Sequence, residues 1–241
     1  MNRALWAAAT GMAAQQQNLD VITQNLANAD VAGFKGAFAS FTDIAGPGGT
    51  LGTQSAAVRT FFNQGRLVHS GGPFDVAIDG PGFFAVHDSR GRRAYTRNGE
   101  FSRSSDGTLR NAQGWRLDGV RIPSGATGVT VRDDGTVTVQ AGGSSKTCGH
   151  IRLAQFAAPD ALESSGGTLF YATPSSGKPH FVAPGTPHGP SLAFGSLEQS
   201  NVTIVEAMME ILAAQRAYEA NAKGVQAADE MMRIADNLSR S

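Results

Sequence analysis

Residues whose types could do metal or cofactor chemistry are scattered in this sequence. A zinc site needs three or four ligands brought together, most often at short spacing on one element. The histidines lie far apart except for the last two: His69, His87, His150, His180 and His188. Cys148 is the single cysteine, which excludes an internal disulfide and a cysteine metal cluster. The sequence therefore predicts no metal site and no bound cofactor.

Catalytic constellations are equally hard to find. No Gly-x-Ser-x-Gly string is present, and Asp133 and Asp134 are adjacent, so on a strand they would point to opposite faces. Gly80-Pro81-Gly82 resembles a phosphate loop but lacks the third glycine and the helix that follows one. Turns explain both strings better. We predict no catalytic residue and no enzyme, although distant carboxylates could still pair in a hydrolase site.

The most regular spacing in the chain is apolar. Side chains recur every seven residues near the start, at Leu5, Met12, Leu19 and Leu26, and near the end, at Ile204, Ile211, Tyr218, Val225 and Met232. A repeat of seven stays on one side of a helix that winds around a partner. Small residues three positions after the second series would let the partner's backbone approach: Ala207, Ala214, Asn221, Ala228 and Ala235. We expect the two ends to pair as a coiled-coil-like stem.

The polar face of the first helix carries amides where charges are usual. The series is Gln15, Gln16, Gln17, Asn18, Gln24, Asn25 and Asn28. A solvated helix normally carries lysine and glutamate on its outer face. Amides without charges favour a helix whose outer face is covered by hydrogen-bonding neighbours, and a glutamine-rich surface helix is the alternative. Because one pair of helices buries little surface, we expect the tails to become ordered only among other subunits.

The middle of the chain has the pattern of an antiparallel β domain. The chain contains 30 glycines, and turn signals separate short alternating runs of apolar residues. Asp133-Asp134-Gly135 between two Val-x-Val runs predicts a hairpin. We therefore predict an α+β fold with a mainly β body. The expected parts are a stem helix at 1–33, a connector at 34–65 (flexible over 43–57), an antiparallel β domain at 66–196 and a second stem helix at 197–241.

Overall charge points to no polyanionic partner. The 20 basic residues balance the 20 acidic residues, so we expect neither nucleic-acid binding nor attraction to an anionic membrane. The densest basic stretch, Arg90–Arg103, fits the solvated face of a hairpin. No apolar run has the length of a membrane span, and glutamines interrupt any signal-like start. We expect no membrane insertion, and an export route that leaves the N-terminus in place.

Particular strings then resemble the flagellar rod and hook protein family. The N-terminal string is Asn25-Leu26-Ala27-Asn28 followed by Gly33-Phe34-Lys35, with Val31-Ala32 where a threonine is more usual. The β body contains Asp75, Gly80, Gly82 and Phe83, followed by Tyr95, Thr96, Arg97 and Gly99. The C-terminal strings are Leu197-Glu198-Gln199-Ser200-Asn201-Val202 and, further on, Gln215-Arg216-Ala217-Tyr218-Glu219. The strings cover both ends and much of the β body, in the family's order.

The resemblance implies a structural subunit of the flagellar basal-body rod, which polymerises into a helical, torque-transmitting shaft. It implies partners among copies of itself and other rod and hook proteins, and export by the flagellar type III apparatus to a periplasm-spanning rod. The start and end of the chain are most similar to the distal-rod branch. The short segment after Phe41 leaves the proximal-rod branch as the alternative. A non-flagellar fibre with a β head, forming a discrete trimer, is less favoured.

The resemblance and the residue types together suggest roles for single residues. Leu5, Met12, Leu19 and Leu26 would pack on Ile204, Ile211, Tyr218 and Val225. Asn25 and Asn28 would bond neighbouring backbones or cap the helix end. Gly33 would let the chain turn away from the stem, and Phe34 would anchor that turn. Ordinary helix-end chemistry is the alternative for each of these.

Overall fold

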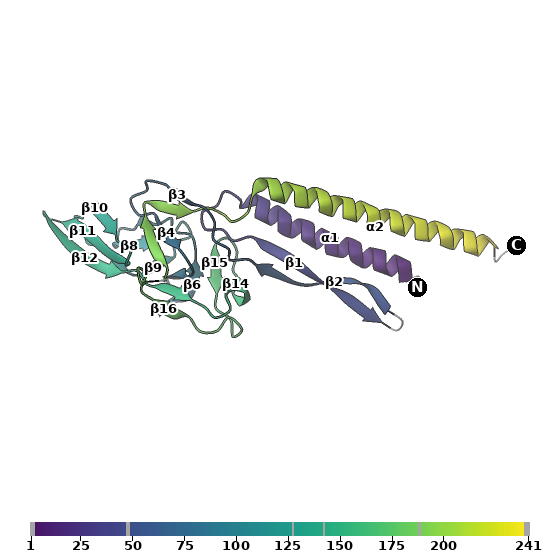
Figure 1. Cartoon of the computed structure of the whole chain (residues 1–241), viewed down its shortest axis with the longest axis horizontal. Coiled ribbons are helices and arrows are strands. Elements are labelled where there is room, and N and C mark those ends of the chain that lie inside the picture. The colour runs from purple at the N-terminus through teal and green to yellow at the C-terminus, as the bar shows by residue number, and fades with distance from the viewer. Residues whose placement is uncertain (1–2, 47–48, 127, 142, 188, 239–241) are drawn as a thin grey trace. The chain divides into compact units, whose positions relative to one another are not determined.

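A computed structural model describes residues 3–46, 49–126, 128–141, 143–187 and 189–238 (Figure 1). The chain divides into two compact units. The first, here called the stem unit, consists of Met1–Ala27, Ala37–Phe61 and Val202–Ser241. The second, here called the β unit, consists of Asn28–Gly36 and Phe62–Asn201. Chain segments that are distant in sequence therefore share each unit.

The stem unit contains two helices and a hairpin. Helix α1 spans Arg3–Ala27 and helix α2 spans Ile204–Leu238. They lie side by side in Figure 1 and run in opposite directions, so the start of α1 and the end of α2 are at the same end of the unit. Alanine and glutamine, which favour helices, dominate α1. The predicted pairing of the two terminal helices is present.

Helix α2 begins with a side-chain cap. The Thr203 hydroxyl oxygen accepts the Glu206 N–H over 3.4 Å, and the hydroxyl donates to the Glu206 carboxylate over 2.6 Å. Thr-x-x-Glu is the sequence pattern of a capping box. The expected stem helix at 197–241 therefore begins later, because Ser196–Glu198 instead forms strand β18 and pairs with another strand.

Strands β1 (Ala37–Gly46) and β2 (Gly49–Thr60) form a long antiparallel hairpin in the stem unit. The expectation of a flexible connector over 43–57 is thus wrong for the described residues, while Pro47 and Gly48 lie outside them. The physical reason is pairing along both arms, from Ala37 opposite Thr60 down to Gly46 opposite Gly49. The hairpin also packs on α1, where Thr10 Oγ1 accepts the Thr53 N–H over 3.2 Å.

The β unit is built almost entirely from short antiparallel strands. Their bounds are β3 Leu67–His69, β4 Val76–Asp79, β5 Phe83–His87, β6 Arg93–Thr96, β7 Ser102–Arg103, β8 Thr108–Arg110, β9 Arg116–Arg121, β10 Gly128–Val131, β11 Thr136–Ala141, β12 Ser144–His150, β13 Leu153–Gln155, β14 Glu163–Ser164, β15 Leu169–Tyr171, β16 His180–Val182, β17 Ser191–Phe194 and β18 Ser196–Glu198. A short 3-10 helix covers Pro159–Ala161.

The main sheet has the strand order β10-β11-β12-β9-β5-β6-β15-β14, and β13 joins β5 to β16 beside that path. Strands β7 and β8 extend it from β9, while β17 pairs with β4 and β18 with β3. The predicted hairpin is confirmed, because β10 and β11 pair with Val131 opposite Val137. Gly135 occupies its turn at a φ of 82°, which favours glycine.

The core of the β unit lies on both faces of β5. Phe84 and Val86 point into the larger apolar cluster, and Phe83 and Ala85 into a second cluster with Tyr95. Alternate side chains of a strand face opposite sides, so a strand buried on both faces reads as a continuous apolar run. The α+β fold with a mainly β, antiparallel body is confirmed. The sequence suggested that the first helix ends near Gly33, but helix α1 ends earlier, at Ala27.

Candidate functional site

The seam between α1 and α2 is lined by small side chains. Ile22 of α1 forms a buried cluster with Ala207 and Ala214 of α2, and each of the three is at most 4% exposed. Leu19 and Ile211 pack against this cluster from its edges. Alanine lets two helix backbones approach closely, so the seam is held by close contact more than by large interlocking side chains.

The predicted heptad residues lie in three environments in the structure. Leu19, Leu26 and Ile211 pack on the seam cluster, and Leu5, Met12, Val225 and Met232 are half-buried. Ile204 and Tyr218 are exposed, by 43% and 38%. The buried line on α2 follows the alanines three positions later, including Ala228. The sequence pattern gave the right period, and the alanines that it placed beside the partner's backbone are buried in the seam, whereas Ile204 and Tyr218 of the larger series are not.

Helices α1 and α2 also approach each other closely toward the other end of the seam. A Cβ atom on Gly11 of α1 would lie 3.0 Å from the side-chain nitrogen of Asn221 on α2. That separation is tighter than ordinary van der Waals contact, so only glycine fits at position 11 without displacing the asparagine. Gly11 opposite Asn221 and Ile22 beside Ala207 and Ala214 also fix the antiparallel direction of the helices.

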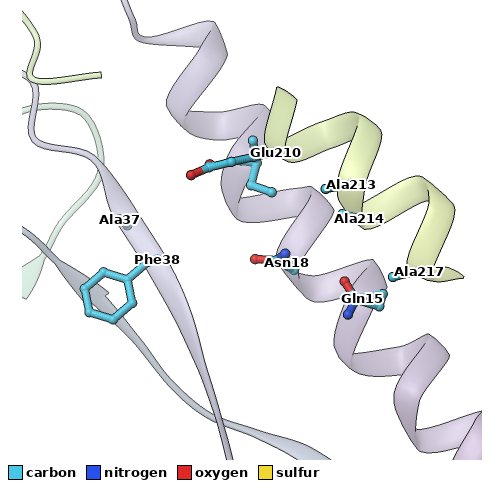
Figure 2. A pocket seen from close by; sticks show the side chains of 9 residues that line it. Gln15, Asn18, Ala37, Phe38, Glu210, Ala213, Ala214 and Ala217 are labelled. Atoms are coloured by element: carbon cyan, nitrogen blue, oxygen red, sulfur yellow. The ribbon is translucent and has the colours of Figure 1, made fainter. Parts of the chain in front are cut away.

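A groove of about 400 Å³ runs between α1, α2 and β1 within the stem unit (Figure 2). Figure 2 shows the amides of Gln15 and Asn18, the Glu210 carboxylate and the Phe38 ring around it. Alanines of α2 form another wall. Phe38 is 48% exposed. The groove therefore offers hydrogen-bonding amides together with apolar surface, which suits a protein neighbour more than a small charged ligand.

Exposed apolar side chains are concentrated in the stem unit. Among the described residues, all large apolar side chains with high exposure belong to it: Trp6, Phe38, Phe41, Val58, Ile204, Val205, Met208, Met209, Leu212, Tyr218, Met231, Ile234 and Leu238. On α2 the residues Val205, Met208, Met209 and Leu212 follow helical spacing, so they form one stripe. Large contiguous apolar patches on a surface mark interaction sites.

The N-terminal and C-terminal family strings meet inside the β unit. The Lys35 ammonium donates to Glu198 Oε1 over 2.5 Å, and Arg97 Nη1 donates to Glu198 Oε2 over 3.3 Å. The side chains of Lys35 and Glu198 are fully buried, and that of Arg97 is 4% exposed. Burial lowers the pKa of Lys35, and Glu198 opposes that shift; burial also lowers the pKa of Arg97.

Backbone contacts of the same strings reinforce this arrangement. The Gly33 N–H donates to the Glu198 carbonyl over 2.7 Å, and the Asn201 N–H donates to the Phe34 carbonyl over 3.4 Å. Gly33 has a φ of 67°, and a Cβ there would overlap the backbone of Arg97 and Asn98. Gly33 is therefore needed for both its conformation and its close approach.

The remaining family-motif residues lie in several environments. Gly80 donates its N–H to Gln64 Oε1 over 3.0 Å, Asp75 accepts the Ser70 hydroxyl over 2.6 Å, and Thr96 accepts the Asn98 N–H over 3.0 Å. The others are buried Gly82, Phe83, Tyr95 and Gly99, half-buried Asn28, Ser200 and Val202, and exposed Arg216. Most of them support the β unit, and Val202 packs beside the seam cluster of the stem unit.

The basic stretch Arg90–Arg103 does not form one solvated face. Arg92 is exposed and pairs with Asp88 over 2.7 Å, while Arg93 lies over the Phe181 ring at 5.6 Å. Arg97 turns into the core. Arg103 donates to the Pro123 carbonyl over 2.9 Å. The arginines of this stretch point in different directions because side chains alternate along a strand, and because the buried carboxylate of Glu198 binds Arg97.

The described residues give little support for metal binding or for a membrane-spanning helix. They contain no group of three histidine, cysteine, aspartate or glutamate side chains that could hold a metal ion. No helix in the described ranges has both the length and the apolar character needed to cross a membrane. His87 Nδ1 contacts Asp118 Oδ1 at 2.5 Å, but both side chains are about one-third exposed.

Sequence reasoning missed Thr203, and it identified Glu198 only as part of the C-terminal family string. The Thr-x-x-Glu pattern that begins at Thr203 was available as a helix-start signal. Nothing in the sequence marked Glu198 as a buried acceptor, because its partners are distant along the chain. Charged residues are uncommon in strands, so the glutamate of β18 gave only a weak signal that its side chain has a buried partner.

Three family descriptions match the chain in order. "Flagella basal body rod protein" matches residues 5–35, "Flagellar hook protein FlgE/F/G D1 domain" residues 77–139, and "Flagellar basal body rod FlgEFG protein C-terminal" residues 194–238. The first covers most of α1 and the N-terminal string, and the last covers the whole of α2. The matched segments thus include the seam and both partners of the Lys35–Glu198 pair.

Curated relatives match over nearly the whole chain. The flagellar basal-body rod protein FlgG of Agrobacterium fabrum is 37% identical over 96% of this chain and 97% of its own length. FlgG of Borreliella burgdorferi is 37% identical over 100% of both chains. The hook protein FlgE of Escherichia coli is 39% identical over 54% of this chain and 32% of its own length. The chain therefore belongs to the flagellar basal-body rod protein family, in its distal-rod branch.

Proposed function

We propose that the chain is a structural subunit of the distal rod of the bacterial flagellar basal body. It polymerises through its stem unit into a helical shaft that transmits torque. Its partners are copies of itself and other rod and hook proteins. The proximal-rod alternative is not favoured, because the FlgG proteins described above match along nearly the whole chain.

The observation that carries this proposal is the distribution of exposed apolar surface. In the described part of the chain, the highly exposed large apolar side chains all belong to the stem unit. Val205 is 68% exposed and Met209 57%, on a helix whose opposite side is already buried in the seam. Covering such side chains releases on the order of 25 cal/mol per Å² of apolar area. The stem unit is thus the part of the subunit that gains most from neighbours.

The surfaces of the stem unit also suit open-ended growth. An open helical assembly needs two different surfaces on each subunit that fit each other, whereas a two-fold dimer uses one surface twice. The groove and the α2 stripe are two different surfaces of one subunit, which favours head-to-tail assembly over a two-fold dimer. Head-to-tail contacts either close into a ring or continue as an open helix, and membership of the rod protein family favours the open helix over the discrete trimer of a fibre protein.

We infer that the subunit has a structural role only, without enzymatic activity, nucleic-acid binding or membrane insertion. It is exported by the flagellar type III apparatus with its N-terminus retained and resides in the periplasm-spanning rod. N-terminal sequencing of the chain from purified basal bodies tests the export route. A cleaved N-terminus would exclude it.

Complementation tests the function and the role of the stem together. A deletion strain should lack motility, and the unaltered chain should restore it. Leu19→Asp or Ile211→Asp places a carboxylate beside the seam cluster and should abolish assembly and motility while the β unit stays folded. Ser145→Asp, on the exposed part of β12, is the matched control and should restore swimming.

Two outcomes would overturn the proposal. A deletion strain that still swims and builds a complete rod would show that the chain is not a rod subunit. Normal motility with Leu19→Asp would show that the α1–α2 seam is not needed for assembly.

A further inference from the structure

The chain passes between the two units four times, after Ala27, Gly36, Phe61 and Asn201. The β unit consists of residues 28–36 and the single stretch 62–201. Three connecting segments therefore continue into the stem unit: residues 28–36 at both ends, the start of the long stretch at Phe62, and its end at Asn201. The contacts that hold these three segments together inside the β unit determine where the four connections leave it.

Hydrogen bonds join the three segments to one another. Asn201 accepts the Gly36 N–H over 2.8 Å and donates its amide to the Asn63 carbonyl over 3.1 Å. The Gln199 N–H donates to the Arg66 carbonyl over 2.9 Å. The side chain of Asn201 therefore contacts both of the other segments.

Glu198 is the centre of the arrangement. Its Oε1 accepts the Lys35 ammonium over 2.5 Å and the Gly65 N–H over 2.9 Å, and its Oε2 accepts Arg97 Nη1 over 3.3 Å. Lys35 donates a second hydrogen bond to the Asn63 carbonyl over 2.8 Å. One carboxylate thus binds a donor from each of the other two segments and one from the body of the sheet.

The charges in this cluster do not balance. Two cations, Lys35 and Arg97, share the single carboxylate of Glu198, and all three side chains are at least nine-tenths buried. Among the described residues, Arg97 Nε has no hydrogen-bond partner. Loss of the Lys35 charge would leave a neutral Arg97–Glu198 pair. Loss of the Glu198 charge would leave two adjacent buried cations, which is far less favourable.

We propose that Lys35, Arg97 and Glu198 form a positioning site that holds the three connecting segments of the β unit as one junction. The Glu198 carboxylate is its essential member. The site makes the release of any one segment unfavourable, because a broken contact leaves a buried charge uncompensated. This role goes beyond polymerisation itself, and only its motility test rests on the proposed function.

Hydrogen exchange on the full-length chain tests the junction. The reporting amides are those bonded within it, at Gly33, Gly36, Gly65 and Gln199, and the reference amides are those of β11 and β12. Glu198→Gln keeps the side-chain shape and removes the charge. Exchange at the reporting amides should rise at least tenfold, with less than a twofold change at the reference amides.

The order of the variants follows from the charge count. Lys35→Met should raise exchange at the reporting amides less than Glu198→Gln does. Exchange at the reporting amides should be slower in the double variant Lys35→Met/Glu198→Gln than in Glu198→Gln alone, because the double variant removes one of the two uncompensated cations. Arg92→Met, which removes the cation of the exposed pair with Asp88, is the matched control and should change neither set.

Three results would overturn the inference: no change with Glu198→Gln, an equal rise at reporting and reference amides, or a larger effect of Lys35→Met than of Glu198→Gln. In a strain lacking its own copy, Glu198→Gln should fail to restore motility and Arg92→Met should restore it. If the unaltered chain also failed to restore motility, the proposed function would be refuted. The exchange data would still decide the junction by themselves.

Discussion

The side-chain amide of Asn25 pairs with both backbone groups of Ala37. Asn25 Nδ2 donates to the Ala37 carbonyl over 2.7 Å, and its Oδ1 accepts the Ala37 N–H over 2.9 Å. This is the pattern by which one strand residue pairs with another. The last turn of α1 is thereby joined to the first residue of β1 within the stem unit. Asn25 bonds a neighbouring backbone, one of the two roles expected from its residue type.

Asn25→Ala should destabilise the stem unit, because it leaves both Ala37 groups without their side-chain partner. We expect the free energy of unfolding to fall by about 1–3 kcal/mol. Urea unfolding followed by circular dichroism at 222 nm measures the loss. Gln17→Ala, at an exposed amide of the same helix, is the control and should change the value by less than about 0.5 kcal/mol. Equal effects of the two variants would contradict the role of the Ala37 pairing.

Ala207→Leu should force the two helices apart at the seam. Ala207 is 2% exposed and packs with Ile22, and it does not line the groove, so three extra carbon atoms have no space there. Overpacking of this kind costs about 1–3 kcal/mol. Ala220→Leu, on the exposed side of α2, controls for the change in helix propensity. The midpoint of urea unfolding distinguishes them, and an unchanged midpoint for Ala207→Leu would mean that the seam is loosely packed.

Gly33→Ala and Gly91→Ala form a matched pair. Both glycines have positive φ, 67° and 80°, so alanine should cost about 1–2 kcal/mol of backbone strain at either position. A Cβ at Gly91 meets nothing within 4 Å, whereas at Gly33 it overlaps the backbone of Asn98. Gly33→Ala should therefore be the more destabilising by at least about 1 kcal/mol. Trp115 fluorescence in a Trp6→Phe background measures this; similar losses for both would argue against the close approach.

The pKa of Lys35 predicts an alkaline pH dependence of stability. Burial holds this pKa below its usual 10.5, so between the lowered value and 10.5 the unfolded chain binds more protons than the folded chain. The Lys35 contribution to the free energy of unfolding should therefore increase as pH rises through that window and be lost as pH falls through the lowered pKa. The difference between the unaltered chain and Lys35→Met, measured by urea unfolding at several pH values, isolates it. A difference independent of pH would exclude the effect.

The sequence allowed the architecture to be predicted, because each main element has a local pattern. The heptad spacing indicated both stem helices, and Asp133-Asp134-Gly135 indicated the β10–β11 hairpin. The β1–β2 hairpin was missed, because glycine and proline between its arms suggested flexibility and its arms lack strong apolar alternation. In the hairpin the ladder of backbone hydrogen bonds decides the structure, and residue types report that ladder poorly.

The candidate site could be predicted less well. The spacing correctly placed Ala207 and Ala214 close to the partner helix, but Ile204 and Tyr218, which were expected to pack there as well, are exposed. The junction joins Lys35 to Glu198 across most of the chain, and no local spacing encodes such a pair. The family strings contained Lys35, Arg97 and Glu198, but their physical role becomes visible only when the fold brings the three side chains together.

The most direct test of the central claim is mass spectrometry of hook–basal bodies purified from the bacterium that carries this chain. The account predicts that the chain is a stoichiometric component of the rod, and that a strain lacking it yields particles with a rod truncated before its distal part. Complete rods in the deletion strain, or purified particles without the chain, would contradict the account.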